Sequence, residues 1–568
     1  MEGVYKDDND IALAASRLGI TFFDRLYRDK SAIIVFQNSY GQQFSGQRAG
    51  LYELTAQLFT LSSQFGDSGN DDEWKRLIAA ELALDSCCPA AHREYFFSLN
   101  RDLDKDSMAQ ASSDGLEESV DKILKTPEQI AQTSFSLGMT FFELIHNITA
   151  DHDADNQFTE ADGDKYISDK RLYFELTINL LGMAVMHRGS HRDYFWLGSV
   201  KREYAGDSSC QDKMKFCYMA IADLETAIML SNDRSAIYVY SAGSAECTLA
   251  QKLYEQINAT PHLPDSKVLE KIERLYRVGI YNMREVVSHH DIDTFALAIA
   301  EFELAEVLEI KLDTLKSATL NPEIEALHQE IGSFYRSSIE RCGISRRNEE
   351  RNDPNRMHCL GRAQLGLANY LTQHTDVFDV VEVQSLYTNA YHNIKRAALK
   401  EEDVGNNHWL GVVSYDYGQF LERFTEPKPA DKIITLYQES INCHAKSAEE
   451  NKRSHDKYLQ VRSMIALADF LEQGDDLPEA QLPNDSKNPE ELYKEAKAML
   501  EGIAEESPLC IKLLSLAEYG LAAHLDSWER MPMLQSALEH AQKSYSMKEE
   551  EDTSILIEGI RRAMTDDL

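Results

Sequence analysis

The sequence has little of what makes tight turns or catalytic loops. Its 568 residues include 27 glycines and 13 prolines, and scarcity of both favours long helices over many short strands. The sequence contains no glycine-rich phosphate loop, GxSxG elbow, HExxH or paired CxxC. Since these motifs position catalytic groups, nothing argues for an enzyme. We expect no catalytic residues and no cofactor.

Long apolar runs are also missing. The most apolar stretch, Leu176 to Met186, is too short to cross a bilayer and contains Thr177 and Asn179. The first ten residues lack the basic-then-apolar pattern of a secretory signal. Nine cysteines without CxxC spacing predict buried free thiols in a reducing compartment. We therefore expect a cytoplasmic or nuclear protein.

Positive charge is in short supply. The chain has 95 acidic and 58 basic residues, a net charge of −37. A field of that sign repels nucleic-acid phosphates and anionic lipids and attracts basic proteins. It also keeps a large protein soluble without naming any partner. We expect no direct nucleic-acid partner and no membrane partner, while a basic protein partner stays open. The oligomeric state is not indicated.

A leucine-tyrosine pair, followed three residues later by a small residue, recurs along the chain. Two helices approach closely only where a short side chain lies at their crossing, and the tyrosine hydroxyl then finds a polar partner at the edge. Recurrence every 50 to 59 residues is typical of stacked helical repeats. The copies are Leu275-Tyr276 with Gly279, Phe334-Tyr335 with Ser338, Leu386-Tyr387 with Ala390, Leu436-Tyr437 with Ser440 and Leu492-Tyr493 with Ala496.

Each of these B helices follows an A helix, which often has its own marker, a Leu-Gly pair. The best copies contain Trp196-Leu197-Gly198 and Trp409-Leu410-Gly411. Glycine inside a helix costs about 1 kcal/mol, so its recurrence predicts close contact between helices. The interval 355–400 shows the whole unit, with an A helix over 355–372 and a B helix over 381–399.

These residues resemble the tetratricopeptide-repeat superfamily over roughly residues 127–548. The resemblance implies an all-α protein, an α-α superhelix or solenoid of long helix pairs. The departures are a spacing above that family's 34 residues, Trp directly before Leu, and a mostly absent closing proline. The residues that match are Trp409, Leu410, Gly411 and Tyr415 or Tyr417 on the A helix, and Ala390 and Ala397 on the B helix.

A second resemblance concerns the segment Glu491–Leu500, which follows an acidic linker. It is similar to the last repeat of the fungal enhancer-of-translation-termination family. That resemblance implies a nuclear or cytoplasmic regulator of translation, or of a hydroxylase partner, with no catalytic residues of its own.

Four regions are predicted along the chain. Residues 1–100 form an irregular N-terminal helical region, with helices over 11–28 and 51–65 and a turn or short extended piece over 31–50. Residues 101–126 are an acidic and polar linker, 127–548 the repeat array, and 549–568 a capping helix with an acidic tail. The predicted helix pairs are 127–188, 191–231, 235–289, 294–342, 355–400, 406–448, 454–503 and 508–548.

Repeats of this kind act by recognition, because stacked pairs form a groove lined by the A helices. We predict a non-enzymatic scaffold or adaptor that binds a partner peptide or helix in that groove. The alternatives are an acidic chaperone of histones or ribosomal proteins, and a regulator of translation termination. The residues predicted to line or shape the groove are Tyr370, Trp409, Tyr415 and Tyr417. For each of them the alternative is inter-helix core.

A basic run between residues 336 and 356 is the other candidate binding element. Its arginines, Arg346 and Arg347 among them, either clamp a partner's carboxylate or phosphate or pair with the acidic bulk of the array.

Candidate metal ligands are few. Asp151, Asp153, Asp155 and Asp162 occupy calcium-loop positions, although Asn156 replaces the usual glycine; the alternative is a plain acidic loop. His187 and His191 have zinc-ligand spacing but flank a helix end, where histidine also interacts with the helix dipole. The segment 289–293 offers either a metal site or an N-cap.

Overall fold

The computed structural model describes most of the chain from residue 126 onward and parts of the N-terminal region. It divides into two compact units, Met1–Asp293 and Thr294–Leu568. The described residues are 8–28, 33–37, 43–47, 54–55, 57–58, 124, 126–154, 160–231, 234–258, 266–288, 294–315, 322–343, 353–374, 378–400, 404–451, 454–473, 488–501 and 507–566.

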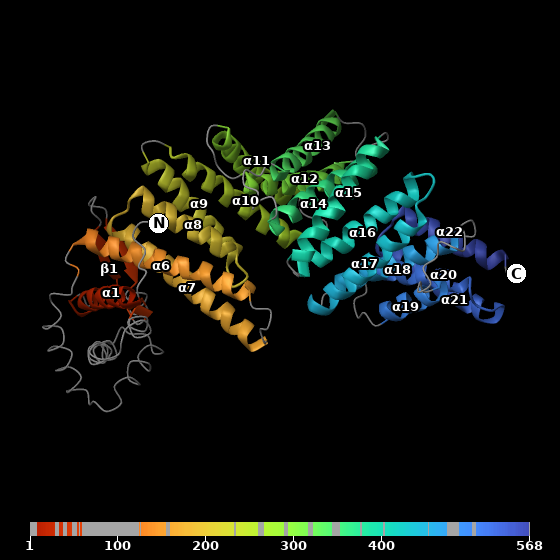
Figure 1. Cartoon of the computed structure of the whole chain (residues 1–568), viewed down its shortest axis with the longest axis horizontal. Helices are drawn as coiled ribbons and strands as arrows, with labels where there is room; N and C mark the ends of the chain where they lie inside the picture. Colours follow the sequence, from red (N-terminus) through yellow and green to blue (C-terminus); the bar gives the residue numbers. More distant parts are fainter. Residues whose placement is uncertain are drawn as a thin grey trace, which may run out of the picture. The chain divides into compact units, whose positions relative to one another are not determined.

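The described part of the first unit contains three antiparallel helix pairs (Figure 1). Before them come a helix and a two-stranded antiparallel hairpin in which Phe36 pairs with Phe44, within the segment predicted as a turn or extended piece. The elements are α1 (Asp8–Arg28), β1 (Ile33–Gln37), β2 (Gln43–Gln47), α6 (Pro127–Ala154), α7 (Glu160–His187), α8 (His191–Gly206), α9 (Lys213–Leu230), α10 (Ala236–Asn258) and α11 (Ser266–Val287). The predicted linker, 101–126, lies almost entirely outside the described residues.

The described part of the second unit has five helix pairs and a final helix that packs on the last pair. Its elements are α12 (Phe295–Leu315), α13 (Pro322–Gly343), α14 (Pro354–His374), α15 (Val380–Lys400), α16 (Val404–Phe424), α17 (Ala430–Asn451), α18 (Ser454–Glu472), α19 (Pro489–Glu501), α20 (Pro508–Ala522), α21 (Ser527–Met547) and α22 (Glu551–Asp566). The predicted all-α solenoid of long helix pairs is confirmed.

The recurring tyrosines are core residues of the B helices. All five are at most 3% exposed. The hydroxyls of four reach an acceptor on the A helix of their own pair, as expected for a buried tyrosine. Tyr387 donates to Asn369 Oδ1 at 2.6 Å. The equivalent contacts are Tyr335 to Glu309, Tyr437 to Glu422 and Tyr493 to Asp469.

The small residue after each tyrosine lies at the helix crossing. Ser440 Oγ donates to the Gly411 carbonyl oxygen at 2.7 Å. A Cβ added at Gly279 would lie 2.5 Å from the Gly243 carbonyl oxygen. This distance is shorter than a contact between a carbon and an oxygen that are not bonded to each other. A Cβ at Gly361, in one of the Leu-Gly pairs, would lie 2.5 Å from Ile394 Cγ1. Backbones therefore approach closely within a pair, as the Leu-Gly pattern predicts.

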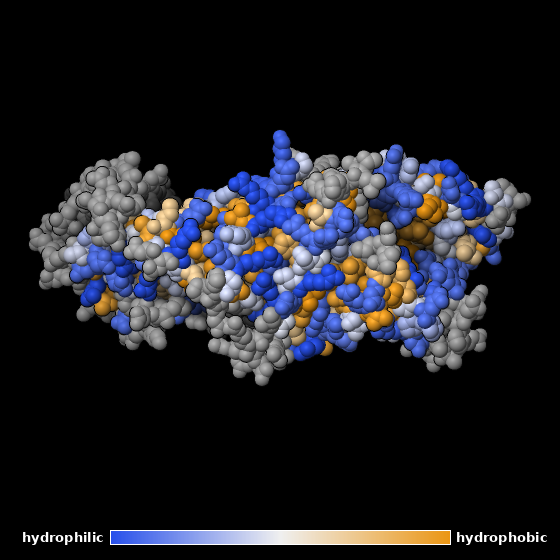
Figure 2. All heavy atoms as spheres, turned by 90° about the horizontal axis from the view of Figure 1, so that it is seen from above, coloured by the Kyte–Doolittle hydropathy of each residue, from blue (hydrophilic) through white to orange (hydrophobic). Residues whose placement is uncertain are grey.

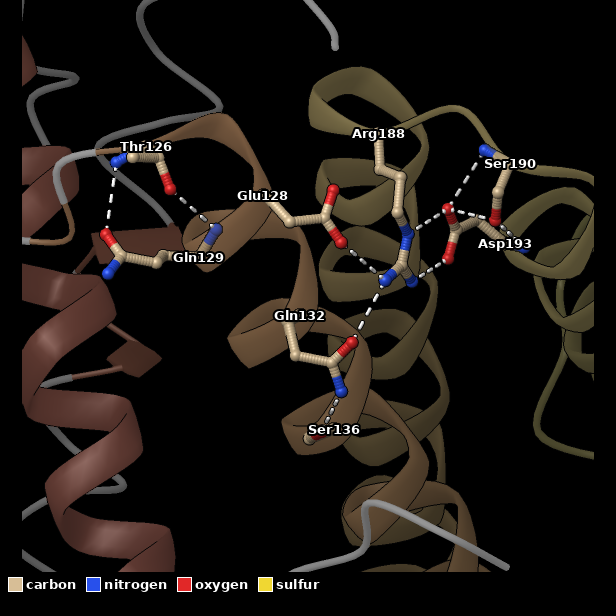
Figure 3. Close-up of polar contacts among 8 residues, drawn as sticks. All are labelled: Thr126, Glu128, Gln129, Gln132, Ser136, Arg188, Ser190 and Asp193. Atoms are coloured by element: carbon tan, nitrogen blue, oxygen red, sulfur yellow. Dashed lines mark hydrogen bonds and ion pairs between the residues drawn. The ribbon is translucent and has the colours of Figure 1, made fainter.

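Polar contacts join one pair to the next at the α7–α8 turn (Figure 3). Arg188 Nε donates to Asp193 Oδ2 at 2.8 Å, and Nη1 donates to Gln132 Oε1 on α6 at 3.0 Å. Asp193, fully buried, also completes the capping box of α8 with Ser190. One arginine thus links α6, α7 and α8, while Gly189, at φ 66°, supplies the left-handed turn.

None of the helices in the described residues is long and apolar enough to cross a membrane. On the face shown in Figure 2, hydrophilic residues are interleaved with smaller groups of hydrophobic ones. Of the seven described cysteines, all free, six are buried and Cys443 is partly buried. The predicted burial is confirmed for these six, whereas Cys87 and Cys88 lie outside the described residues.

Candidate functional site on the A helices of the second unit

Consecutive A helices of the second unit contact one another: α12 with α14, α14 with α16, α16 with α18 and α18 with α20. The described parts of consecutive B helices do not contact one another to that extent; these helices are α13, α15, α17, α19 and α21. The A helices are therefore the closely spaced side of this unit. We define its A-helix face by five partly buried side chains on α14, α16 and α18: Arg362, Trp409, Tyr415, Asp416 and Arg462.

Arg362 lies between two aromatic rings. Its guanidinium carbon is 4.2 Å from the centroid of the Trp409 ring and 4.6 Å from that of Phe302, so one cation stacks on rings from two neighbouring A helices. Arg362 Nη2 also lies 3.6 Å from Glu306 Oε1. Burial raises the pKa of Glu306, and the arginine opposes that shift. Arg362 is thus held in place as part of the face.

Arg462 is stacked but not paired. Its guanidinium carbon lies 3.9 Å from the Tyr415 ring centroid. Its Nε is buried without a hydrogen bond, and the guanidinium forms neither hydrogen bond nor ion pair with any residue that the structure describes. Nearby, Asp416 Oδ2 accepts from Asn369 Nδ2 at 2.9 Å, and desolvation raises the pKa of Asp416 against the charge of Arg462. The face therefore contains a guanidinium group that stacks on a ring and has an Nε atom without an internal hydrogen bond.

The four aromatic residues predicted for the groove divide into two classes. Tyr370 and Tyr417 are 2% and 1% exposed, so the core alternative holds for both. Their hydroxyls are used internally, Tyr370 donating to the His328 carbonyl oxygen at 3.0 Å and Tyr417 accepting from Lys432 Nζ at 2.6 Å. Trp409 and Tyr415 are partly buried, and they remain candidates.

The basic run contributes mainly internal contacts where it is described. Arg341 Nε pairs with Glu301 Oε2 at 3.0 Å, and Arg336 Nη2 lies 3.4 Å from Glu382 Oε1. These are the pairings with acidic residues that the structural alternative predicts. Arg346 and Arg347 lie outside the described residues, so their role in partner binding stays a prediction.

The calcium candidate is only partly described. Asp151 and Asp153 belong to α6 and Asp162 to α7, while Asp155 lies outside the described residues; the site stays a prediction. His187 is in the last turn of α7, and His191 Nδ1 lies 2.8 Å from the Tyr238 hydroxyl. The segment 289–293 also lies outside the described residues.

Sequence reasoning missed Arg362, Asp416 and Arg462. A signal was available, since Arg362 precedes Trp409, and Tyr415 precedes Arg462, by about one repeat length. Aligning the A helices in register would have placed these side chains side by side. It also missed one group with metal-ligand chemistry among the described residues, His408 with His444 and Asp456.

Comparisons with known proteins do not assign the chain to a family. No family model and no curated protein matches the chain. Among solved structures, the chain is similar to the S. pombe nuclear import adaptor Nro1, at 13% identity and TM-score 0.29, covering 65% of this chain and 96% of that one. It is also similar to a human IFIT1 dimer with m7Gppp-AAAA, at 11% identity and TM-score 0.30, covering 97% of each. Likeness at this level supports no argument about function.

Proposed function

We propose that the protein is a non-enzymatic scaffold or adaptor that binds a peptide or helix of a partner protein on the A-helix face. The observation that carries the proposal is Arg462, stacked on Tyr415 with no hydrogen bond or ion pair to a described residue. Recognition on such a face uses hydrogen bonding and ring stacking and breaks no bond. We place this role in the cytoplasm or nucleus.

The chemistry of the face favours a particular partner group. A guanidinium donates well to a carboxylate or a backbone carbonyl, and Arg, Trp and Tyr are the residue types that dominate binding energy at protein interfaces. The occupant is then a segment whose oxygen accepts from Arg462 while an apolar or aromatic side chain packs against Trp409.

The test compares partner recovery by the tagged full-length protein with that of two single variants, Arg462→Ala and Trp409→Ala. The matched control is Arg561→Ala, which removes an exposed arginine of α22 away from the face. We expect each face variant to weaken binding of the same partner by at least ~10-fold, with the control unchanged. Equal recovery of all partners by folded face variants would contradict the proposal.

A second candidate, an acidic chaperone of basic proteins, is supported by the net charge of −37. Long-range attraction of this kind is screened by salt. Histones or basic ribosomal proteins would then bind wild type and Arg462→Ala alike and dissociate as salt is raised. A complex that resists high salt, or that Arg462→Ala abolishes, excludes this candidate.

A role in translation termination is the most specific candidate and has the narrowest support. It depends on the segment Glu491–Leu500, which lies in α19 with Leu492, Tyr493, Ala496 and Leu500 buried. Stop-codon readthrough, compared in cells with and without the protein, tests it directly. Unchanged readthrough would contradict it.

A further inference from the structure

Three consecutive helices bring a histidine–histidine–aspartate cluster together at one buried point. His408 comes from α16, His444 from α17 and Asp456 from α18, and one ligand atom of each lies within 4.8 Å of the other two. His408 Nδ1 is 2.6 Å from Asp456 Oδ1, and His444 Nδ1 is 3.9 Å from the same oxygen. Asp456 and His444 are at most 3% exposed as side chains.

His444 is the unexplained member. Neither of its ring nitrogens has a hydrogen-bond partner among the described residues, and such a buried polar group costs about 1–3 kcal/mol. A Cβ added to Gly411 would lie only 2.6 Å from the nearest atoms of the His444 ring. Gly411 of the Trp-Leu-Gly marker therefore makes room for this imidazole. Packing alone gives no reason to place an imidazole there.

The carboxylate of Asp456 is held by its neighbours, as the carboxylates of metal sites are. His408 Nδ1 lies 2.6 Å from one of its oxygens. Ser447 Oγ holds the second carboxylate oxygen at 3.1 Å, the kind of outer contact that orients metal ligands.

We propose that His408, His444 and Asp456 bind one divalent transition-metal ion of the zinc class, through one nitrogen of each imidazole and one oxygen of Asp456. Ligand atoms about 2.0–2.2 Å from zinc lie roughly 3–3.5 Å apart in a tetrahedral site. The ligand atoms of the present cluster lie within 4.8 Å of one another, so binding draws them closer together. The ion connects α16, α17 and α18, two successive helix pairs, with a water molecule as fourth ligand.

The preceding repeat supplies a matched control. There His358 Nδ1 lies 2.7 Å from Asn406 Oδ1, the same histidine contact one repeat earlier, but with an amide in place of the carboxylate. Since an amide oxygen is a poorer zinc ligand than a carboxylate, His358→Gln should leave metal binding intact. Asp456→Asn instead replaces the carboxylate of the proposed site with an amide, the group that Asn406 supplies in the preceding repeat.

The experiment titrates the chelator-treated, tag-free full chain with Co²⁺ and then with Zn²⁺ as competitor, for wild type, His408→Gln, Asp456→Asn and His358→Gln. We expect wild type and the control to bind one Co²⁺ with the strong visible absorption of four-coordinate cobalt, and Zn²⁺ to displace it. The two site variants should lose more than ~10–100-fold in metal affinity, the loss that follows when only an outer contact is removed.

Two results would overturn the inference. One is wild-type binding no tighter than that of a folded Asp456→Asn protein. The other is a weak absorption typical of six-coordinate cobalt at exposed carboxylates. Circular dichroism checks folding, and if Asp456→Asn does not fold, His408→Gln decides, because the His408 side chain is 24% exposed.

Discussion

Carboxylates that are partly buried between paired helices affect the stability of this acidic protein. Glu246 on α10 shows this. Its Oε2 accepts from Asn282 Nδ2 on α11 at 3.1 Å, yet burial raises its pKa to about 7. The folded first unit therefore holds a carboxyl group that is only partly ionised at neutral pH.

The first prediction concerns the pH dependence of stability. An unfolded glutamate ionises near its ordinary value, whereas folded Glu246 keeps its proton up to about pH 7. Between those values the unfolded chain binds fewer protons, so the free energy of unfolding falls as pH rises. Glu246→Gln should stabilise the protein at about pH 8 by about 1–2 kcal/mol, after discounting for partial exposure, and not at about pH 4.

Urea unfolding at both pH values measures this difference. Glu270→Gln, an exposed glutamate of α11, is the control and should change stability little at either pH. An equal effect of Glu246→Gln at both pH values would exclude ionisation as the cause.

The recurring residues make their contacts within a helix pair. The tyrosine fills the space between two helices, its hydroxyl bonds the A helix, and the small residue allows the crossing. In the pair α10–α11, Gly243 and Gly279 face each other so closely that either Cβ would meet the other's carbonyl oxygen. The side chains of the A helices that do not take part in these contacts can then form the A-helix face.

The second prediction tests this crossing. Gly279→Ala should destabilise the protein by about 1–3 kcal/mol, because backbone must move to admit the methyl group, which outweighs the gain in helix propensity. Gly182→Ala on α7 is the control, since a Cβ there meets nothing within 4 Å, and it should stabilise by about 0.5–1 kcal/mol. Thermal unfolding of both variants decides, and equal shifts would contradict the close approach.

At the scale of the whole molecule, each of the two units is a series of helix pairs, and within a unit each pair contacts the next. Such arrays derive stability from repeat-to-repeat interfaces rather than from one central core. One apolar cluster of the second unit extends from Leu365 to Leu521 across successive pairs. The helix α22 covers the last pair with Leu556, Ile557 and Ile560. Both clusters lie wholly within that unit.

The third prediction follows from these clusters. A fragment comprising Thr294–Leu568 should be helical and unfold cooperatively by itself, as followed by circular dichroism during heating. A gradual loss of helicity without a transition would mean that this unit depends on residues outside it. The same fragment without α22 should unfold at lower temperature, because its last apolar surface is exposed.

The sequence by itself determined the helices, their pairing and the buried tyrosines, since helical period and small residues at crossings are local features of the chain. It did not separate Tyr370 and Tyr417, which are core, from Trp409 and Tyr415, which are partly exposed, because an aromatic side chain suits a helix–helix core and a binding surface alike. Only the tertiary structure brought His408, His444 and Asp456 together. Their meeting depends on the register of three packed helices, which no single helix encodes.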